Sequence, residues 1–173
     1  INESGFSGNE KLRVYCSTET HSSVEKAAKI AGLGRKNLVK IATDKHYRLE
    51  AGLLVNAINN DIKSGYKPLC VVATLGTTGC TAIDPLKEIA AACTDSGTWL
   101  HVDAAYGGSA LLLPEYRYMI EGIENADSFV FNPHKWMFTN FDCSAYFVKD
   151  KEALLRTFEI LPEYLKTASR VLV

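Results

Sequence analysis

The stretch WLHVDAAYGG, residues 99–108, runs from apolar residues to a carboxylate and then to small residues. A second stretch, NPHKW at residues 132–136, follows another apolar run and carries a lysine. In α/β proteins, ligands bind where buried strands end at the carboxyl edge of the sheet. Asp103 and Lys135 are therefore expected at strand ends, beside a pocket.

Short apolar segments alternate with segments of helical periodicity along most of the chain. The apolar segments are rich in β-branched or aromatic residues, and the helical ones repeat apolar residues at three- and four-residue steps. Strands are predicted at residues 38–42, 69–74, 99–103, 128–132 and 144–148, and helices at residues 23–31, 49–64 and 84–94. The alternation predicts an α/β fold with a mostly parallel sheet and helices on both faces.

Local signals mark some ends of these elements. Asp84 is predicted to cap the third helix, with Pro85 at its first position. Gly65 is expected near the end of the second helix, and the polar residues 1–10 read as a loop.

Composition narrows the class of protein. The 173 residues are 47% hydrophobic and 23% charged, which indicates one globular domain. The net charge of −1 comes from interspersed charges without a basic stripe, so nucleic acid is not an expected partner. No apolar run approaches the roughly 20 residues of a membrane helix, so no membrane association is expected.

The cysteines and the termini bear on location. Five cysteines without a C-x-x-C pair indicate free, reduced thiols and a cytoplasmic location. The chain starts without methionine or a signal pattern, so we expect an internal or processed piece of a larger cytosolic subunit.

Lys135 and Asp103 suggest a specific chemistry. A lysine amine forms a Schiff base with an aldehyde cofactor, and a carboxylate holds a pyridine nitrogen protonated, as pyridoxal phosphate (PLP) requires. Phe129–Phe131 and Trp136–Phe138 flank the lysine, so it is expected to lie in apolar surroundings that favour its neutral form. The small residues after Asp103 would let a flat ring approach the backbone.

Three further features admit two readings each. The segment TLGTTG, residues 74–79, is either a structural turn or a ligand-facing loop, and it fits neither nucleotide fingerprint. His21 is either a surface-loop residue or a ring that stacks on a cofactor. His101 and Asp103 could be metal ligands, but no chelating spacing accompanies them, and no metal is expected.

Together these segments resemble the group II PLP-dependent amino-acid decarboxylases, most closely the aromatic-L-amino-acid decarboxylase branch. The resemblance extends from residue 15 to residue 166. Its most specific stretches are ATLGTT at 73–78, WLHVDAAY at 99–106, ADSF at 126–129, NPHKW at 132–136 and NFDCS at 140–144.

The resemblance implies a fold, an activity and roles for eight residues. The fold would be the large domain of the fold type I PLP-dependent transferases, and the activity decarboxylation of an aromatic L-amino acid to its amine. Lys135 would bind the cofactor covalently, Asp103 would pair with the ring nitrogen, and His21 and Ala105 would cover its two faces. The remaining matches are Thr78 and Asp84, near the ring and its aspartate, and Asn132 and His134, near the cofactor phosphate.

The resemblance also separates branches of the family and implies missing parts. His134 and the 136–144 pattern favour aromatic substrates over histidine or glutamate, and His21 favours a decarboxylase over the related aldehyde synthases. An amino-terminal dimerisation segment, a phosphate-binding loop, a mobile loop and a small carboxy-terminal domain would lie outside residues 1–173. The full-length protein would be a homodimer, and this chain alone could be only an inactive structural core.

Overall fold

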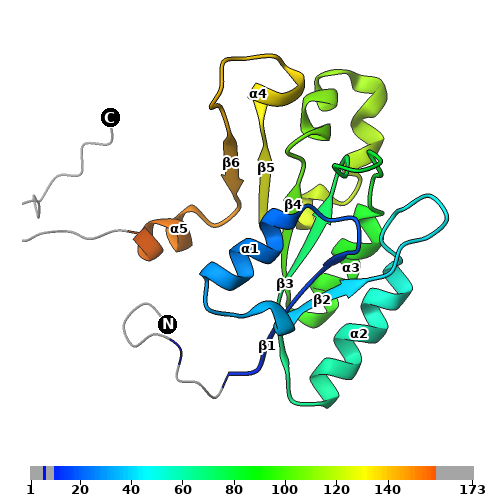
Figure 1. Cartoon of the computed structure of the whole chain (residues 1–173), viewed down its shortest axis with the longest axis vertical. Coiled ribbons are helices and arrows are strands. Elements are labelled where there is room, and N and C mark those ends of the chain that lie inside the picture. The colour runs from blue at the N-terminus through cyan, green and yellow to red at the C-terminus, as the bar shows by residue number, and fades with distance from the viewer. Residues whose placement is uncertain (1–5, 7–9, 159–173) are drawn as a thin grey trace, which may run out of the picture.

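A six-stranded sheet organises the chain, in a computed structural model that describes residue 6 and residues 10–158 (Figure 1). The strand order is β2-β1-β3-β4-β5-β6. Neighbouring strands are parallel except β5 and β6, which are antiparallel. The strands are β1 (Leu12–Ser17), β2 (Leu38–Ile41), β3 (Lys67–Thr74), β4 (Trp99–Asp103), β5 (Ser128–Phe131) and β6 (Ala145–Val148).

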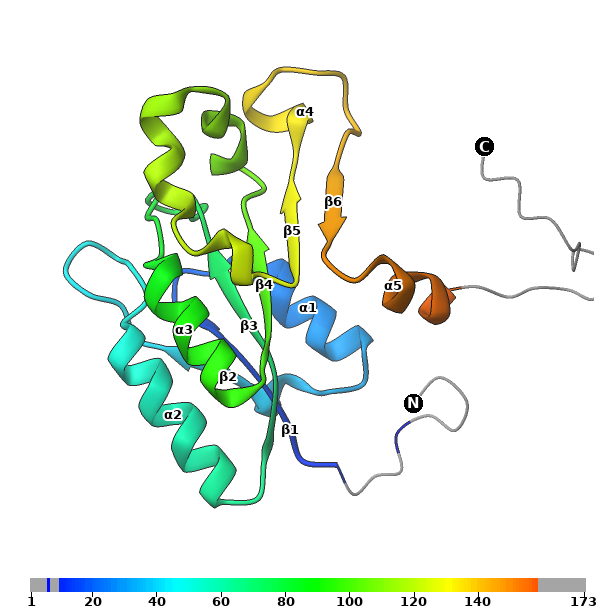
Figure 2. The same ribbon diagram turned by 180° about the vertical axis from the view of Figure 1, so that it is seen from behind.

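Helices cover both faces of this sheet. In Figure 1 α1 lies in front of the sheet, and in Figure 2 α2 and α3 lie in front of the opposite face. The α-helices are α1 (Ser22–Ile30), α2 (Ala51–Lys63), α3 (Leu86–Ser96), α4 (Pro133–Trp136) and α5 (Lys151–Phe158). Short 3₁₀ turns are η1 (Arg35–Asn37), η2 (Gly107–Leu112), η3 (Pro114–Ile120) and η4 (Ile123–Asn125).

This architecture confirms the predicted α/β fold with a mostly parallel sheet and helices on both faces. The predicted strand at 99–103 matches β4, and the other predicted elements are found with end shifts of a few residues. Strand β1 was not predicted, although it lies between β2 and β3. Most of the predicted loop at residues 1–10 lies outside the described residues. Residues 159–166, the last part of the stretch that carries the family resemblance, also lie outside them.

Strand alternation separates two apolar cores. In β3, Val71 and Ala73 join the larger core under α2 and α3, whereas Val72 joins a smaller core with Val24 of α1. Because side chains alternate along a strand, Thr74 faces the α1 side together with Val72. The same alternation places Asp103 of β4 on that side.

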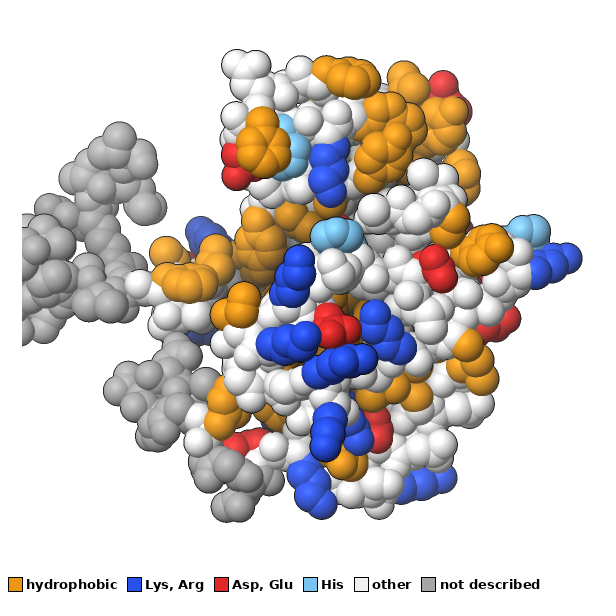
Figure 3. All heavy atoms as spheres, in the orientation of Figure 1, with side chains coloured by type: hydrophobic (Ala, Val, Ile, Leu, Met, Phe, Trp, Pro, Cys, Tyr) orange, Lys and Arg blue, Asp and Glu red, His pale blue; other side chains and the backbone are white. Residues whose placement is uncertain are grey.

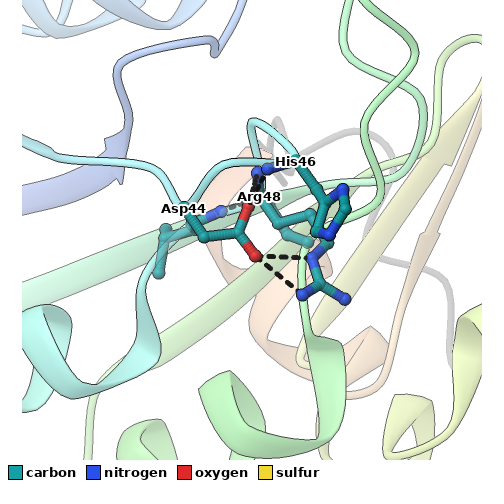
Figure 4. Close-up of polar contacts among 5 residues, drawn as sticks. Asp44, His46 and Arg48 are labelled. Carbon is teal, nitrogen blue, oxygen red and sulfur yellow. Dashed lines mark hydrogen bonds and ion pairs between the residues drawn. The ribbon is translucent and has the colours of Figure 1, made fainter.

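The loop between β2 and α2 is closed by Asp44 (Figure 4). Its carboxylate accepts hydrogen bonds from the amides of His46 and Arg48 at 2.8 and 3.0 Å. The Arg48 guanidinium binds the second oxygen through two nitrogens, at 2.8 and 2.7 Å, and lowers the pKa of Asp44 to about 2. The loop thereby delivers the chain to Leu49, a fully buried core residue.

Asp84 does not cap α3 as predicted. The helix begins at Leu86, and no side chain caps it. The Asp84 carboxylate is instead 2% exposed and accepts the amides of Leu49 and Thr74, both at 2.8 Å. The Asp84 carboxylate therefore accepts two buried amides from other segments, whereas the sequence predicted that it would accept the amides of the first turn of α3.

Burial of Asp84 makes the stability of the fold depend on pH. Burial raises its pKa to about 6, and the two amide hydrogen bonds offset only part of this effect. The folded chain then holds this proton more tightly than the unfolded chain, whose carboxyl has an ordinary pKa near 3.8. The contribution of protonated Asp84 to the free energy of unfolding is fully present below about pH 4 and is lost as the pH rises through about 6.

We expect Asp84→Asn to remove this pH dependence. The free energy of unfolding of the unsubstituted protein, relative to that of the variant, should fall by about 3 kcal/mol between pH 4 and pH 7. Urea unfolding of both proteins across this range measures the difference. Asp95→Asn, at an exposed position of α3, is the control and should leave the profile unchanged. A difference that stays constant with pH would contradict the assignment.

Candidate active site

A cavity of about 580 Å³ opens on the α1 side of the sheet, at the carboxyl ends of β3, β4 and β5. Its walls come from α1 and the turn after it, from β1, from these three strands and from the segments that follow them. Six of the eight predicted site residues line it: His21, Thr78, Asp103, Ala105, Asn132 and Lys135. Residues from distant parts of the chain therefore meet in one space, as the strand-end argument predicts.

Asp103 ends β4 with its side chain in the cavity wall. Its Oδ1 accepts the amide of Ala105 at 3.0 Å. Within the described chain no group donates to Oδ2, so this oxygen can accept a donor from a bound molecule. The backbone after it is held by the Ala104 amide on the Val130 carbonyl, at 2.9 Å, and by the Asn132 amide on the Ala105 carbonyl, at 3.2 Å.

The glycines after Asp103 allow segments of backbone to pack closely. A Cβ on Gly107 would lie 2.5 Å from the carbonyl oxygen of Leu75, and one on Gly108 would lie 2.5 Å from the Cβ of Phe131. The Gly107 amide also donates to the same Leu75 carbonyl at 3.1 Å. These two glycines therefore join the loop after β4 to its neighbours, and Ala105 is the small residue that faces the cavity.

We expect Gly107→Ala to destabilise the protein by about 2 kcal/mol or more, because the added methyl meets backbone that cannot move aside easily. Urea unfolding followed by circular dichroism measures the loss. Gly52→Ala is the matched control, since a Cβ at this α2 position meets nothing within 4 Å. That variant should gain up to about 1 kcal/mol from helix propensity. Equal stabilities of the two variants would refute the close packing.

Lys135 is carried on α4, directly after the end of β5. Its amide donates to the Asn132 carbonyl at 3.0 Å, and the Asn132 side chain accepts the Ser144 hydroxyl at 2.7 Å. The next residue, Trp136, stacks on Tyr106 with ring centroids 4.7 Å apart and planes 8° apart. This stack links the lysine turn to the loop that follows Asp103.

The expected apolar surroundings of Lys135 are not found. Lys135 is exposed, and so are Trp136 and Phe138. Phe129 and Phe131 pack against the larger core on the other face of the sheet, because they alternate with the cavity-facing residues of β5. In Figure 3 apolar side chains gather over the end of the molecule that carries α4.

His21 stands at the amino terminus of α1 and borders the cavity. Its Nδ1 accepts the amide of Ser23 at 3.2 Å and lies 2.9 Å from the Ser23 hydroxyl. An Nδ1 that accepts leaves the proton of the neutral ring on Nε2. His21 thus serves as a helix cap and also forms part of the cavity wall.

The segment at residues 74–79 is a hydrogen-bonded turn, and part of it also lines the cavity. The amides of Gly76 and Thr77 both donate to the Ala82 carbonyl, at 2.9 and 3.0 Å, and the Thr77 hydroxyl accepts the Ala82 amide at 2.9 Å. These groups hold the turn together and do not face a ligand. Thr78 is exposed and lines the cavity.

Asp84 and His134 are not among the residues that line this cavity. Asp84 lies in the interior, where it binds two amides. His134 turns toward the segment after α4, where its Nδ1 accepts the Cys143 amide at 3.0 Å and its ring meets the edge of Phe141.

The cavity wall also holds polar residues that were not assigned to it from sequence, among them Thr74, His101 and Ser144. Strand parity would have identified the first two, since Thr74 pairs with Asp103 in register and His101 precedes Asp103 by two residues. Among residues 10–158, no group of three or more histidine, cysteine or acidic side chains is arranged to hold a metal ion. None of the helices described is long and apolar enough to cross a membrane.

Comparison with known proteins places this site in a family. The model of the pyridoxal-dependent decarboxylase conserved domain matches residues 3–173. Tyrosine decarboxylase of Papaver somniferum is 46% identical over 168 residues, which cover 96% of this chain and 33% of the relative. Aromatic-L-amino-acid decarboxylase of Mus musculus is 48% identical over 157 residues, which cover 91% of this chain and 32% of the relative.

A solved structure agrees with these matches. The crystal structure of Oryza sativa TDC with PLP and tryptamine superposes with a TM-score of 0.90 and 39% identity, over 95% of this chain and 34% of that one. The chain thus spans about one third of the length of the relatives it matches. The fold is the fold type I large domain expected from the sequence, and the chain belongs to the pyridoxal-dependent decarboxylase family.

Proposed function

We propose that the protein uses PLP to decarboxylate an aromatic L-amino acid to the corresponding amine and carbon dioxide. The observation that carries the proposal is the shared cavity, which holds the Lys135 amine and the Asp103 carboxylate at the ends of neighbouring strands. These are the two groups that PLP chemistry requires from a protein.

The residues of the cavity fit this cofactor. Lys135 would hold the aldehyde carbon of PLP through Nζ. Asp103 would offer Oδ2 to the ring nitrogen and keep that nitrogen protonated, while Oδ1 accepts the Ala105 amide. When bound, PLP supplies a protonated ring that accepts the electron pair of the broken Cα–carboxylate bond.

Other residues shape the space around the ring. His21 covers one face from the start of α1, and Ala105 lies against the other, where its small side chain leaves room for a flat ring. Thr78 offers a hydroxyl near the ring, and Asn132, whose side chain accepts the Ser144 hydroxyl, is assigned to the phosphate side. His134 is assigned to the same side as the neighbour of Lys135, although it lies outside the cavity wall. Asp84 acts indirectly, because it holds the Thr74 amide at the end of the strand beside Asp103.

The aromatic substrate class rests on the relatives. Tyrosine and aromatic-L-amino-acid decarboxylases are similar over nearly the whole chain, and similar solved structures include one of Catharanthus roseus tryptophan decarboxylase with L-tryptophan. A 4-hydroxyphenylacetaldehyde synthase of Rhodiola rosea has a similar structure too. Retention of His21 favours simple decarboxylation for this protein.

The test is incubation of the full-length protein with L-DOPA, L-tyrosine, L-tryptophan and 5-hydroxytryptophan in the presence of PLP. We expect carbon dioxide and the matching amine in equal amounts from at least one substrate. Release of neither product from any of the four would refute the proposal. Aldehyde together with hydrogen peroxide would replace it with the oxidative reaction.

We further propose that residues 1–173 are the central part of a large PLP-binding domain in a cytoplasmic homodimer. The dimerisation segment and the small domain are assigned to sequence outside this chain, as its coverage of the relatives suggests. The isolated chain is then an inactive structural core. Borohydride reduction with PLP tests this, since labelling of Lys135 in the isolated chain would disprove it.

A further inference from the structure

His101 lies in the cavity wall two residues before Asp103, on the same face of β4. Directly across the sheet it pairs with Ser128 of β5, whose side chain is 3% exposed. The Ser128 hydroxyl lies 2.9 Å from His101 Nδ1, and the Trp99 indole donates to the same hydroxyl at 2.9 Å. These three side chains form a chain of hydrogen bonds, which we call the relay, and of the three only His101 lines the cavity.

The direction of the hydrogen bonds in this relay follows from the donors available. An indole N–H only donates, so the Ser128 oxygen accepts from Trp99. Within the described chain no other acceptor receives the Ser128 proton, and a buried donor without a partner is costly. The hydroxyl therefore donates to His101 Nδ1, and the ring carries its proton on Nε2. Burial lowers the pKa of His101, which keeps the ring neutral.

An aromatic contact also holds the ring of His101. The ring stacks on Tyr146 with centroids 6.3 Å apart, and Tyr146 pairs with Val130, which in turn pairs with Asp103. His101 and Asp103 are two residues apart on one face of β4, about 7 Å along the strand, and both line the cavity. A neutral N–H donor and the Asp103 carboxylate therefore share one wall of the cavity, and the imidazole adds no positive charge that would compete with a protonated ring nitrogen.

We propose that the relay of Trp99, Ser128 and His101 positions Asp103, with the Nε2–H of His101 donating to the carboxylate through one water. His101 then acts through Asp103 and is a positioning residue. The inference rests on the proposed function in one respect, namely that the ligand of Asp103 is PLP. The tautomer of His101 is a property of the protein without cofactor.

Ser128→Ala tests the relay without changing a residue of the cavity wall. Ser109→Ala is the matched control, because Ser109 is also buried, at 8% exposure, and lies outside both the relay and the cavity wall. In the cofactor-free full-length protein, ¹⁵N NMR should find His101 protonated on Nε2, and a mixture of tautomers in the Ser128→Ala variant. Protonation on Nδ1 in the unsubstituted protein would overturn the proposal.

Cofactor binding supplies the second readout. The dissociation constant of PLP should rise about tenfold in Ser128→Ala, the scale of one charge-assisted hydrogen bond. The ¹⁵N shift of labelled PLP should move toward that of an unprotonated ring nitrogen. Ser109→Ala should change neither quantity, and equal values for the two variants would overturn the proposal. If Ser128→Ala fails to fold, Trp99→Phe, at an exposed position, should show the same two changes, and their absence there would overturn the proposal too.

The two proposals fail separately. An unsubstituted protein that binds no PLP would refute the proposed function while leaving the His101 tautomer as measured. Tight PLP binding with no response to Ser128→Ala would refute the relay alone.

Discussion

Lys135→Arg is expected to abolish covalent attachment of PLP and to lower turnover by about a thousandfold or more, the scale on which removal of a covalent catalytic group acts. The guanidinium keeps the positive charge and most of the length of the side chain. It does not deprotonate in proteins, so it cannot bond to an aldehyde carbon. Borohydride reduction followed by peptide mass analysis measures attachment, and carbon dioxide release measures turnover.

Lys45→Arg is the control for this substitution. Lys45 lies in the exposed loop closed by Asp44, outside the cavity wall. That variant should keep the label on Lys135 and its full activity. Attachment and turnover that survive Lys135→Arg would remove the basis of the proposed function.

Most of the sheet was predictable because its strands are short apolar runs that end abruptly. Strand β4 ends at Asp103, and the carboxyl ends of neighbouring parallel strands lie at one edge of the sheet. From this rule alone, Asp103 and Lys135 were expected beside one pocket. The small residues after Asp103 were predicted to let a flat ring approach the backbone, whereas Gly107 and Gly108 pack closely against protein backbone and a phenylalanine.

Strand β1 escaped prediction because its sequence is weakly patterned. It is a six-residue strand, LRVYCS, that carries an arginine and is followed by a run of polar residues. Its burial is produced by β2 and β3, which pair with it on both sides. Pairing between distant segments is a tertiary effect that local periodicity does not contain.

Two details of the site depended on tertiary contacts as well. Asp84 has the local signature of a helix cap, but the amides of Leu49 and Thr74 reach it from other elements. The aromatic residues next to Lys135 in sequence do not surround it, because alternation turns Phe129 and Phe131 to the opposite face. Sequence proximity is therefore a poor guide to burial at the end of a strand.

Asp103→Asn is expected to lower turnover between about 30-fold and several thousandfold while the fold stays intact. The amide oxygen can still accept the Ala105 amide, which preserves the turn after β4. The negative charge is lost, and a ring nitrogen without a charged partner releases its proton and becomes a weaker electron acceptor. Loss of one partner of a hydrogen-bonded charge pair costs about 2–5 kcal/mol, which sets this range.

The measurements are turnover, PLP affinity and the ¹⁵N shift of labelled PLP in the full-length protein. Asp127→Asn is the matched control, because that carboxylate also accepts a backbone amide, of Leu100 at 2.7 Å, at the opposite end of β4. The control should retain activity and the shift of a protonated ring nitrogen. Both substitutions exchange a carboxylate for an amide beside a backbone donor. They differ in that only Asp103→Asn removes a charge from the cavity wall. Equal turnover in the two variants would mean that Asp103 has no electrostatic role.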